Sequence, residues 1–267
     1  MRLPAELRQP GEALANPHGP HIWDELLTSD VSAAAGFYGK VIGWTAAPFA
    51  AGASTAEAYT ILSAGSSAVG GMMKNPMPTG PIWLGYVGVD DVDAAVAKLQ
   101  SLGGKVYRPA WDTEGVGRMA FVADPQGAMF YVMRGASEEE SDAFAPTTDG
   151  HCAWNELYAT EQKAALDFYR ALFGWEQGGS MPMGEMGDYT FINHGSEMIG
   201  AVMNKPEQAP AVTWNYYFRV SGIEAAVQRI KDGGGTITFG PEEVPGGDWV
   251  INAIDPQGGA FGLAGSK

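Results

Sequence analysis

The chain has 267 residues, a formal net charge of −15 and a single cysteine. This length allows one large domain or two of ordinary size with sizeable cores. A negative surface repels phosphate backbones and anionic lipids, so we expect neither a nucleic acid nor a membrane as a partner. One cysteine excludes an internal disulfide, and the polar N-terminal arm at 1–20 has no apolar run that suits a signal peptide or a membrane span. We therefore expect a cytoplasmic protein.

The predicted elements begin with a strand at 21–28, in which Trp23 and Glu25 share one face by alternation. Asp30 has the position of an N-cap for the helix that follows, and Gly43 ends that helix. Three strand-like segments come next, around residue 44, at 57–63 and at 67–73. This part of the chain therefore predicts one βαβββ module.

The same order recurs immediately afterwards. A strand over 82–89 precedes a helix that Asp90 or Asp91 caps and that a pair of glycines at 103–104 ends. Three more strands are expected, near 105–108, 117–123 and 128–134. Two modules together make one domain.

The second half of the chain repeats the first at an offset of 131 residues. Trp23-Asp24-Glu25-Leu26 returns as Trp154-Asn155-Glu156-Leu157, and Asp124-Pro125-Gln126-Gly127 returns as Asp255-Pro256-Gln257-Gly258. Repeats of this length are domains, so the chain contains four modules in two tandem copies.

The predicted domains span 21–134 and 151–267, and an acidic, polar linker at 135–150 joins them. Strand-rich modules with one helix each predict an α+β fold. We expect curved mixed sheets that form cup-shaped clefts, with the helices outside.

Several repeated segments are typical of one superfamily. In the first domain they are Phe37-Tyr38, Gly43-Trp44, the run from Val89 to Ala95, Gly103-Gly104 and Asp124-Pro125-Gln126-Gly127, and most recur in the second. On these residues the chain resembles the vicinal-oxygen-chelate superfamily, which includes glyoxalase I, extradiol dioxygenases, fosfomycin-resistance enzymes and bleomycin-binding proteins. Within it, the chain is similar to a tandem-domain branch that includes a mycobacterial secreted antigen of similar size. The resemblance covers the chain after residue 20 and specifies the fold far better than the activity.

The resemblance implies a divalent metal in each cleft, held by His, Gln or Glu and acting as a Lewis acid. At the family's ligand positions this chain has Trp23, Leu84 and Tyr131 in the first domain, and Trp154, Asn215 and Gly262 in the second. Indole, alkyl and glycine side chains donate nothing to an ion. We therefore expect no metal ligands and no cofactor, with a divalent metal on displaced ligands as the alternative.

The four histidines do not restore such a site. His21 and His151 are expected to be surface residues at the starts of strands, and they are not equivalent under the offset. His18 belongs to the N-terminal arm, and His194 to a turn.

Glu25 and Glu156 are the candidate catalytic residues. Each shares a strand face with the tryptophan two residues earlier. If that face lines a cleft, desolvation raises the carboxyl pKa and suits a general base or a ligand acceptor. The alternative is a structural carboxylate bonded to backbone or to a tyrosine across the sheet.

Aromatic and sulfur-containing side chains are expected beside these glutamates. The candidate ligand-binding residues are Trp23, Tyr59, Met72, Tyr131, Trp154, Tyr189, Met203, Trp214 and Asn215. Such a lining suits flat, apolar molecules, although core packing is the alternative for each aromatic side chain. The loops at 50–54 and 181–186 differ between the repeats, so one cleft can bind a ligand while the other is structural.

Three functions remain open. The first is metal-free binding of a small aromatic or apolar metabolite or drug, for sequestration or resistance. The second is a metal-independent lyase, isomerase or oxygenation-related enzyme with a glutamate base, and the third is a metal-dependent glyoxalase-like lyase or dioxygenase. The partner is a small molecule in each case. Because the two domains supply the pairing that shorter relatives obtain by dimerisation, a monomer suffices, with a homodimer as the alternative.

Overall fold

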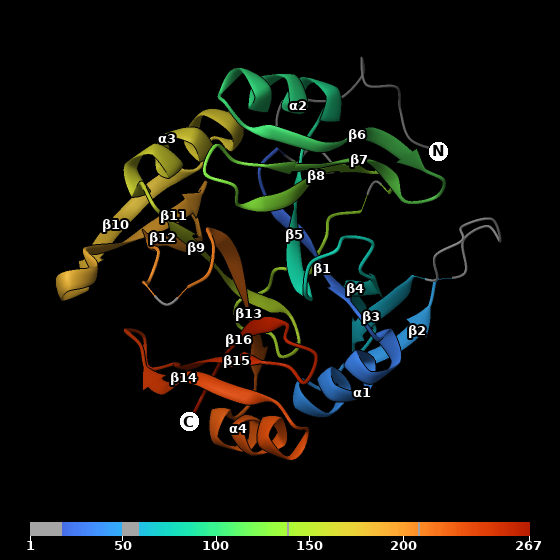
Figure 1. Ribbon diagram of the computed structural model, residues 1–267, viewed down its shortest axis with the longest axis vertical. Coiled ribbons are helices and arrows are strands. Elements are labelled where there is room, and N and C mark those ends of the chain that lie inside the picture. Colours follow the sequence, from blue (N-terminus) through green and yellow to red (C-terminus); the bar gives the residue numbers. More distant parts are fainter. Residues whose placement is uncertain (1–17, 50–58, 138, 208) are drawn as a thin grey trace.

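Over residues 18–49, 59–137, 139–207 and 209–267, which the computed structural model describes, the chain forms two eight-stranded sheets and four α-helices (Figure 1). The first sheet and its helices contain β1 (His21–Thr28), α1 (Val31–Val41), β2 (Thr45–Pro48), β3 (Thr60–Ala64), β4 (Ser67–Lys74), β5 (Ile82–Gly88), α2 (Val92–Ser101), β6 (Lys105–Thr113), β7 (Gly117–Ala123) and β8 (Met129–Gly135). The predicted βαβββ order and the α+β class are confirmed. The stretch at 50–54 and most of the N-terminal arm lie outside the described residues.

The second sheet repeats this order. Its elements are β9 (Cys152–Ala159), α3 (Gln162–Phe173), β10 (Glu176–Pro182), the 3-10 turn η2 (Gly184–Met186), β11 (Asp188–His194), β12 (Glu197–Asn204), β13 (Thr213–Val220), α4 (Ile223–Asp232), β14 (Thr236–Glu243), β15 (Trp249–Ile254) and β16 (Ala260–Gly265). The sheet orders are β2-β3-β4-β1-β5-β8-β7-β6 and β10-β11-β12-β9-β13-β16-β15-β14. In both sheets the first strands of the two modules are adjacent and antiparallel at the centre. The repeated Trp-x-Glu-Leu segments therefore occupy the middle of each sheet.

The helix starts follow from capping. The Asp30 side chain accepts a hydrogen bond from the backbone N–H of Ala33 at 3.0 Å, and that of Asp91 accepts from Ala94 at 2.9 Å. These bonds satisfy amides that the helix itself leaves unpaired. Asp30 is thus confirmed as a cap, and Asp91 rather than Asp90 caps α2. None of the described helices has the length and apolarity that crossing a membrane requires.

The helices cover one face of each sheet, and the two helix-covered faces share one apolar core. Leu26 and Phe37 of the first domain and Leu157 and Tyr169 of the second all belong to this core. Helix α1 contacts α4, and α2 contacts α3, so the helices of the two domains meet in pairs (Figure 1). The opposite faces, here called the helix-free faces, carry separate and smaller apolar clusters.

The repeated Asp-Pro-Gln-Gly turns hold the two domains together. Asp124 Oδ1 accepts hydrogen bonds from three backbone N–H groups of its own turn, at 2.8 to 2.9 Å. Its Oδ2 accepts from the Tyr169 hydroxyl of the other domain at 3.1 Å, and Asp255 accepts from Tyr38 at 3.0 Å. The motif that marks the repeat is therefore also an interdomain contact.

Gln126 of the same turn makes four bonds to the other domain. Its Oε1 accepts from the Thr160 N–H, the Thr160 hydroxyl and the Glu161 N–H at 2.7 to 2.8 Å, and its Nε2 donates to the Glu161 carbonyl at 2.9 Å. These groups immediately precede α3, so Gln126 ties the start of that helix to the first domain.

Replacing Gln126 by alanine is expected to lower the free energy of unfolding by about 1–2 kcal/mol, because several partly exposed hydrogen bonds are lost together. Chemical denaturation measures the change. The control is Gln100→Ala, at an exposed helix position, which is expected to change stability by less than about 0.5 kcal/mol. Equal effects of the two substitutions would contradict a role of Gln126 in joining the domains.

Candidate functional site: two buried glutamates

The first candidate site surrounds Glu25 on the helix-free face of the first sheet. Glu25 lies in the middle of β1, between Gly71 of β4 and Leu84 of β5, and its side chain is buried. Its Oε1 accepts from the Tyr86 hydroxyl at 3.0 Å, whereas Oε2 is buried without a hydrogen bond among the described residues. Beside it, the Trp23 indole donates to the Tyr59 hydroxyl at 2.9 Å.

Burial raises the pKa of Glu25 to about 7, and the hydroxyls of Tyr86, Tyr59 and Tyr131 offset part of this rise. Burial also raises the pKa values of these tyrosines, and the Glu25 charge adds to the effect, so the phenols remain neutral donors. A carboxyl group of this kind can take up or release a proton near neutral pH.

The second candidate site repeats this arrangement around Glu156 of β9. Its two oxygens accept from the hydroxyls of Tyr189 at 2.7 Å and Tyr217 at 3.0 Å, and the Trp154 indole donates to Tyr189 at 2.8 Å. Burial raises the pKa of Glu156, and the hydroxyls of Tyr189, Tyr217 and Tyr158 lower it in part. Bonds to tyrosines across the sheet are those expected of a structural carboxylate, and they are equally compatible with an acid–base group.

Strand register decides which predicted ligand residues lie beside the glutamates. Trp23, Tyr59 and Tyr131 surround Glu25, and Trp154, Tyr189, Met203 and Asn215 lie on the face of Glu156.

Two predicted positions need correction. Met72 pairs with Leu26 and Trp214 with Leu157, so both lie in the helix-covered core, where the Trp214 indole donates to Tyr169. The cause is alternation: Met73, one residue after Met72, packs on the helix-free face of the first sheet instead.

The histidine prediction is also wrong in part. His21 and His151 are 7 % and 5 % exposed, because the starts of β1 and β9 are buried where the two domains meet. The ring of His151 bonds the carbonyl of Asp142, and His21 bonds Asp24.

The two helix-free faces differ in the side chains that cover them. In the first domain Leu84, Phe121 and Tyr131 pack together with Leu27 and Met119 into one apolar cluster. Tyr131 stacks on Tyr86 with 4.2 Å between ring centroids. The side chains therefore fill the space above Glu25.

At the equivalent positions the second domain has Asn215, Asn252 and Gly262. Asn215 pairs with Glu156 across the strands, and Asn252 pairs with Gly262, which places both amides on the helix-free face. Both residues are half-buried, yet Asn215 Nδ2 and Asn252 Oδ1 have no hydrogen-bond partner among the described residues. Buried polar atoms without partners are uncommon, and a water molecule or a bound ligand can supply the missing bonds.

Gly262 also leaves room for the Tyr217 ring. A Cβ at this position would lie 2.3 Å from Cδ1 of Tyr217, so any larger residue would displace the ring and move its hydroxyl from Glu156. The sequence showed only that Gly262 stands where the family has a metal ligand. Its contact with Tyr217 was not foreseen.

The residues on the helix-free faces do not fit the metal centre that the fold family implies. Each face offers one buried carboxylate bonded to neutral phenols, and an ion of this kind needs several anionic or imidazole ligands at one point. Among the described residues, one group of three His, Cys, Asp or Glu side chains is close enough to share an ion, namely His21, Asp24 and Cys152. This group lies between the domains and not beside Glu25 or Glu156.

Comparison with known proteins agrees with this architecture. The model of the Glyoxalase/Bleomycin resistance protein/Dioxygenase superfamily matches residues 20–132 and 150–262. "Putative glyoxylase CFP32" of Mycobacterium tuberculosis is 32% identical over 249 residues, which covers 90% of this chain and 92% of that protein. "Anthracycline biosynthesis protein DnrV" of Streptomyces peucetius is 30% identical over 270 residues, with 92% of each chain covered.

Solved structures show the same fold. The Mn(II)-bound glyoxalase from Novosphingobium aromaticivorans has a TM-score of 0.62 at 17% identity and covers 93% of this chain and 82% of its own. A variant of homoprotocatechuate 2,3-dioxygenase from B. fuscum has a TM-score of 0.66 at 16% identity, over 96% of this chain and 73% of its own. With both halves of the chain matched by the family model, the protein belongs to the glyoxalase/bleomycin resistance protein/dioxygenase (vicinal-oxygen-chelate) superfamily and contains two tandem domains of that family.

Proposed function

We propose that the helix-free face of the second domain binds a small aromatic molecule that carries polar substituents, and that binding at this face needs no metal. The observation that carries the proposal is the exchange of Leu84, Phe121 and Tyr131 for Asn215, Asn252 and Gly262. In the first domain these positions form an apolar cluster. On this proposal, the face around Glu25 is structural and the face around Glu156 is the binding site.

The second face offers both kinds of contact that such a ligand needs. Trp154, Tyr189 and Phe191 form connected edge-on ring contacts, with Phe191 5.8 Å from Tyr189 and 6.2 Å from Trp154 between centroids. Within the part of the chain that the structure describes, Asn215 Nδ2 is a donor and Asn252 Oδ1 an acceptor without a partner. A ligand that pairs with both regains the free energy that their desolvation costs, which gives specificity for its polar groups.

The names of two relatives support an aromatic ligand. DnrV and DauV are both named for anthracycline biosynthesis. Anthracyclines are flat polycyclic molecules with hydroxyl and carbonyl groups, the combination that rings and carboxamides recognise.

A metal-independent enzyme is the second candidate. It is favoured by the raised pKa of Glu156, whose carboxyl group lies against two neutral tyrosine donors. In that case the carboxylate would accept a proton from the bound molecule, and Tyr189 or Tyr217 would stabilise the resulting charge. Recovery of the ligand after incubation separates the candidates: a binding protein returns it unchanged, whereas an enzyme converts it and Glu156→Gln stops the conversion.

Binding of a hydroxylated anthraquinone, measured by quenching of tryptophan fluorescence, tests the location of the site. Asn252→Phe restores the side chain of the first domain, and we expect it to weaken binding at least about tenfold because it fills the face and removes an acceptor. The control is Tyr131→Phe, which removes a hydroxyl in the first domain while keeping the ring, and it should leave affinity unchanged. Weaker binding with Tyr131→Phe alone would place the site in the first domain, and no binding to the wild type would contradict an aromatic ligand.

A further inference from the structure

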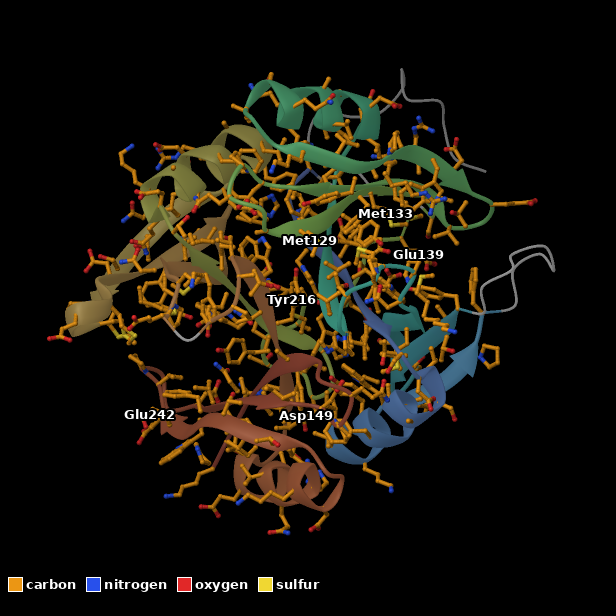
Figure 2. All side chains as sticks on the ribbon, in the orientation of Figure 1. Met129, Met133, Glu139, Asp149, Tyr216 and Glu242 are labelled. Carbon is orange, nitrogen blue, oxygen red and sulfur yellow. The ribbon has the colours of Figure 1, made fainter. Side chains whose placement is uncertain are left out.

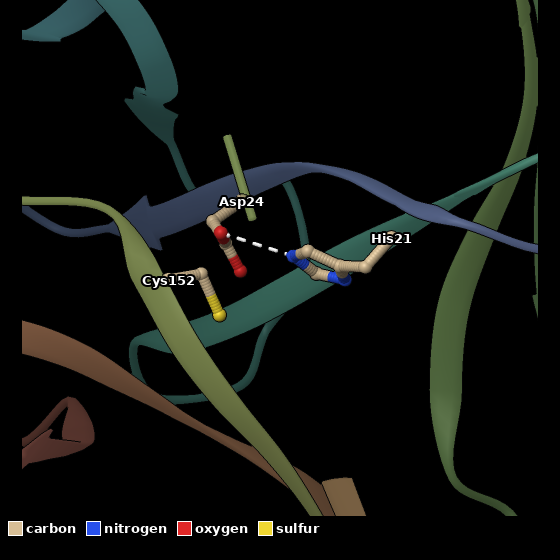
Figure 3. A group of neighbouring side chains, drawn as sticks. All are labelled: His21, Asp24 and Cys152. Atoms are coloured by element: carbon tan, nitrogen blue, oxygen red, sulfur yellow. Dashed lines mark hydrogen bonds and ion pairs between the residues drawn. The ribbon is translucent and has the colours of Figure 1, made fainter. Parts of the chain in front are cut away.

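A second group of reactive side chains lies where the two domains meet, away from both glutamates. His21 and Asp24 of β1 and Cys152 of β9 are 7 %, 1 % and 1 % exposed. One ligand atom of each, a ring nitrogen, a carboxylate oxygen and the thiol sulfur, lies within 4.8 Å of the others (Figure 3). His21 Nε2 and Asp24 Oδ2 are 3.0 Å apart.

The internal repeat explains why these residues meet. His21 and Cys152 are equivalent under the 131-residue offset, and so are Asp24 and Asn155. The equivalent first strands thus approach each other at the domain interface, and Cys152 Sγ lies 3.5 Å from Asn155 Oδ1. The first domain contributes His21 and Asp24, and the second contributes Cys152 and Asn155. The residue types at these equivalent positions therefore differ between the two domains.

The group has unsatisfied bonding capacity. Asp24 Oδ1 is buried without a hydrogen bond among the described residues, and in Figure 3 the Asp24 carboxylate points toward both the imidazole ring and the thiol. A cavity of about 20 Å³ lies alongside, lined in part by His21, Asn155 and Tyr216, which is room for about one water molecule. Figure 2 places Tyr216 near the middle of the molecule.

The charges suit a cation at this point. A divalent ion favours the thiolate form of a coordinating cysteine and pairs with a carboxylate. One thiolate and one carboxylate together neutralise the ion, with a neutral imidazole as third ligand.

We propose that His21, Asp24 and Cys152 bind one zinc ion that joins the two domains. Nitrogen, sulfur and carboxylate ligands in a tetrahedral arrangement suit Zn²⁺ and disfavour Mg²⁺ or Ca²⁺. On binding, the Cys152 thiol loses its proton to solvent and no electron is transferred. The ion is structural, since its three ligands are buried and lie apart from the Glu156 face.

Cobalt(II) titration of the full chain tests this proposal, with the metal alone as probe. Because Cys152 is the single cysteine of the chain, a thiolate-to-cobalt charge-transfer band in the near ultraviolet can come from this residue alone. We expect one Co²⁺ per chain, this band, and its loss when Zn²⁺ displaces the cobalt. Free zinc about 100-fold above its Kd should raise the melting temperature by about 5 °C or more.

Variants separate this site from a metal centre of the family type. Cys152→Ser and Asp24→Asn should abolish the band and the zinc-dependent rise in melting temperature, whereas Glu156→Gln should retain both. A wild-type cobalt spectrum without the thiolate band overturns the proposal, whether or not the variants fold. Loss of cobalt with Glu156→Gln alone also overturns it, and would place the ion beside the second-domain glutamate.

Discussion

Replacing Glu25 by glutamine is expected to stabilise the protein at pH 8, by up to about 3 kcal/mol, and to leave its stability at pH 4 nearly unchanged. The substitution keeps the size of the side chain and an oxygen that accepts from Tyr86. It removes the negative charge that the folded protein must hold in a buried position above neutral pH.

The direction follows from proton binding. Between the ordinary glutamate pKa of 4.5 and the folded value of about 7, the folded protein binds more protons at Glu25 than the unfolded chain does. The free energy of unfolding therefore falls as pH rises through this window. The contribution of Glu25 is fully present below pH 4.5 and is lost above pH 7, so the wild type and the variant should diverge across this range.

Urea denaturation at intervals between pH 4 and pH 8.5 measures the difference. Glu197→Gln, at an exposed position of β12, is the control and should show no such pH-dependent gain. If Glu25→Gln is instead less stable at every pH, the carboxylate is charged in the folded state, and the tyrosine donors outweigh its burial. Glu156→Gln should show a change of the same sign, since burial raises the pKa of that group too.

Much of the fold could be predicted because the second half of the chain repeats the pattern of the first. The repeat at 131 residues defined two domains, and the element order repeated within each domain defined four modules. Alternation along 21–28 placed Trp23 and Glu25 on one face. Capping by Asp30 and Asp91 follows from local chemistry alone, so the helix starts were within reach.

The site was harder to predict from the sequence because it depends on the register between strands. Choosing Met72 over Met73 required knowing that Met72 pairs with Leu26, and a single sequence does not supply that pairing. The pairs Leu84/Asn215 and Phe121/Asn252 are visible in the repeat, yet only the register shows that both amides lie on the face of Glu156.

Burial between the domains was missed for a related reason. His21 and His151 lie at strand starts, where periodicity within one domain predicts exposure. Packing of one repeat against the other buries them, and no pattern within a single module records that contact.

Replacing Asp124 by alanine is the change expected to destabilise the protein most, by about 3–5 kcal/mol. Asp124 is fully buried, and its carboxylate accepts from three backbone amides and from the Tyr169 hydroxyl. Alanine leaves all four donors without this partner, and two of them, the Ala128 N–H and the Tyr169 hydroxyl, are buried. Guanidinium denaturation measures the loss, and Asp149→Ala, at an exposed position, should change stability by less than about 0.5 kcal/mol.

A second substitution separates the turn from the domain contact. Tyr169→Phe removes the interdomain bond to Asp124 and also the acceptor of the Trp214 indole N–H. It should cost about 1–2 kcal/mol, since the turn keeps its three amide bonds to Oδ1 of Asp124. In the double variant Asp124→Ala/Tyr169→Phe no hydroxyl is left without its acceptor, so the total loss should be smaller than the sum of the single losses. An additive double variant would show that Asp124 and Tyr169 act independently. A loss below about 1 kcal/mol for Asp124→Ala would mean that water replaces the carboxylate, and that the shared core rather than the repeated turn holds the domains together.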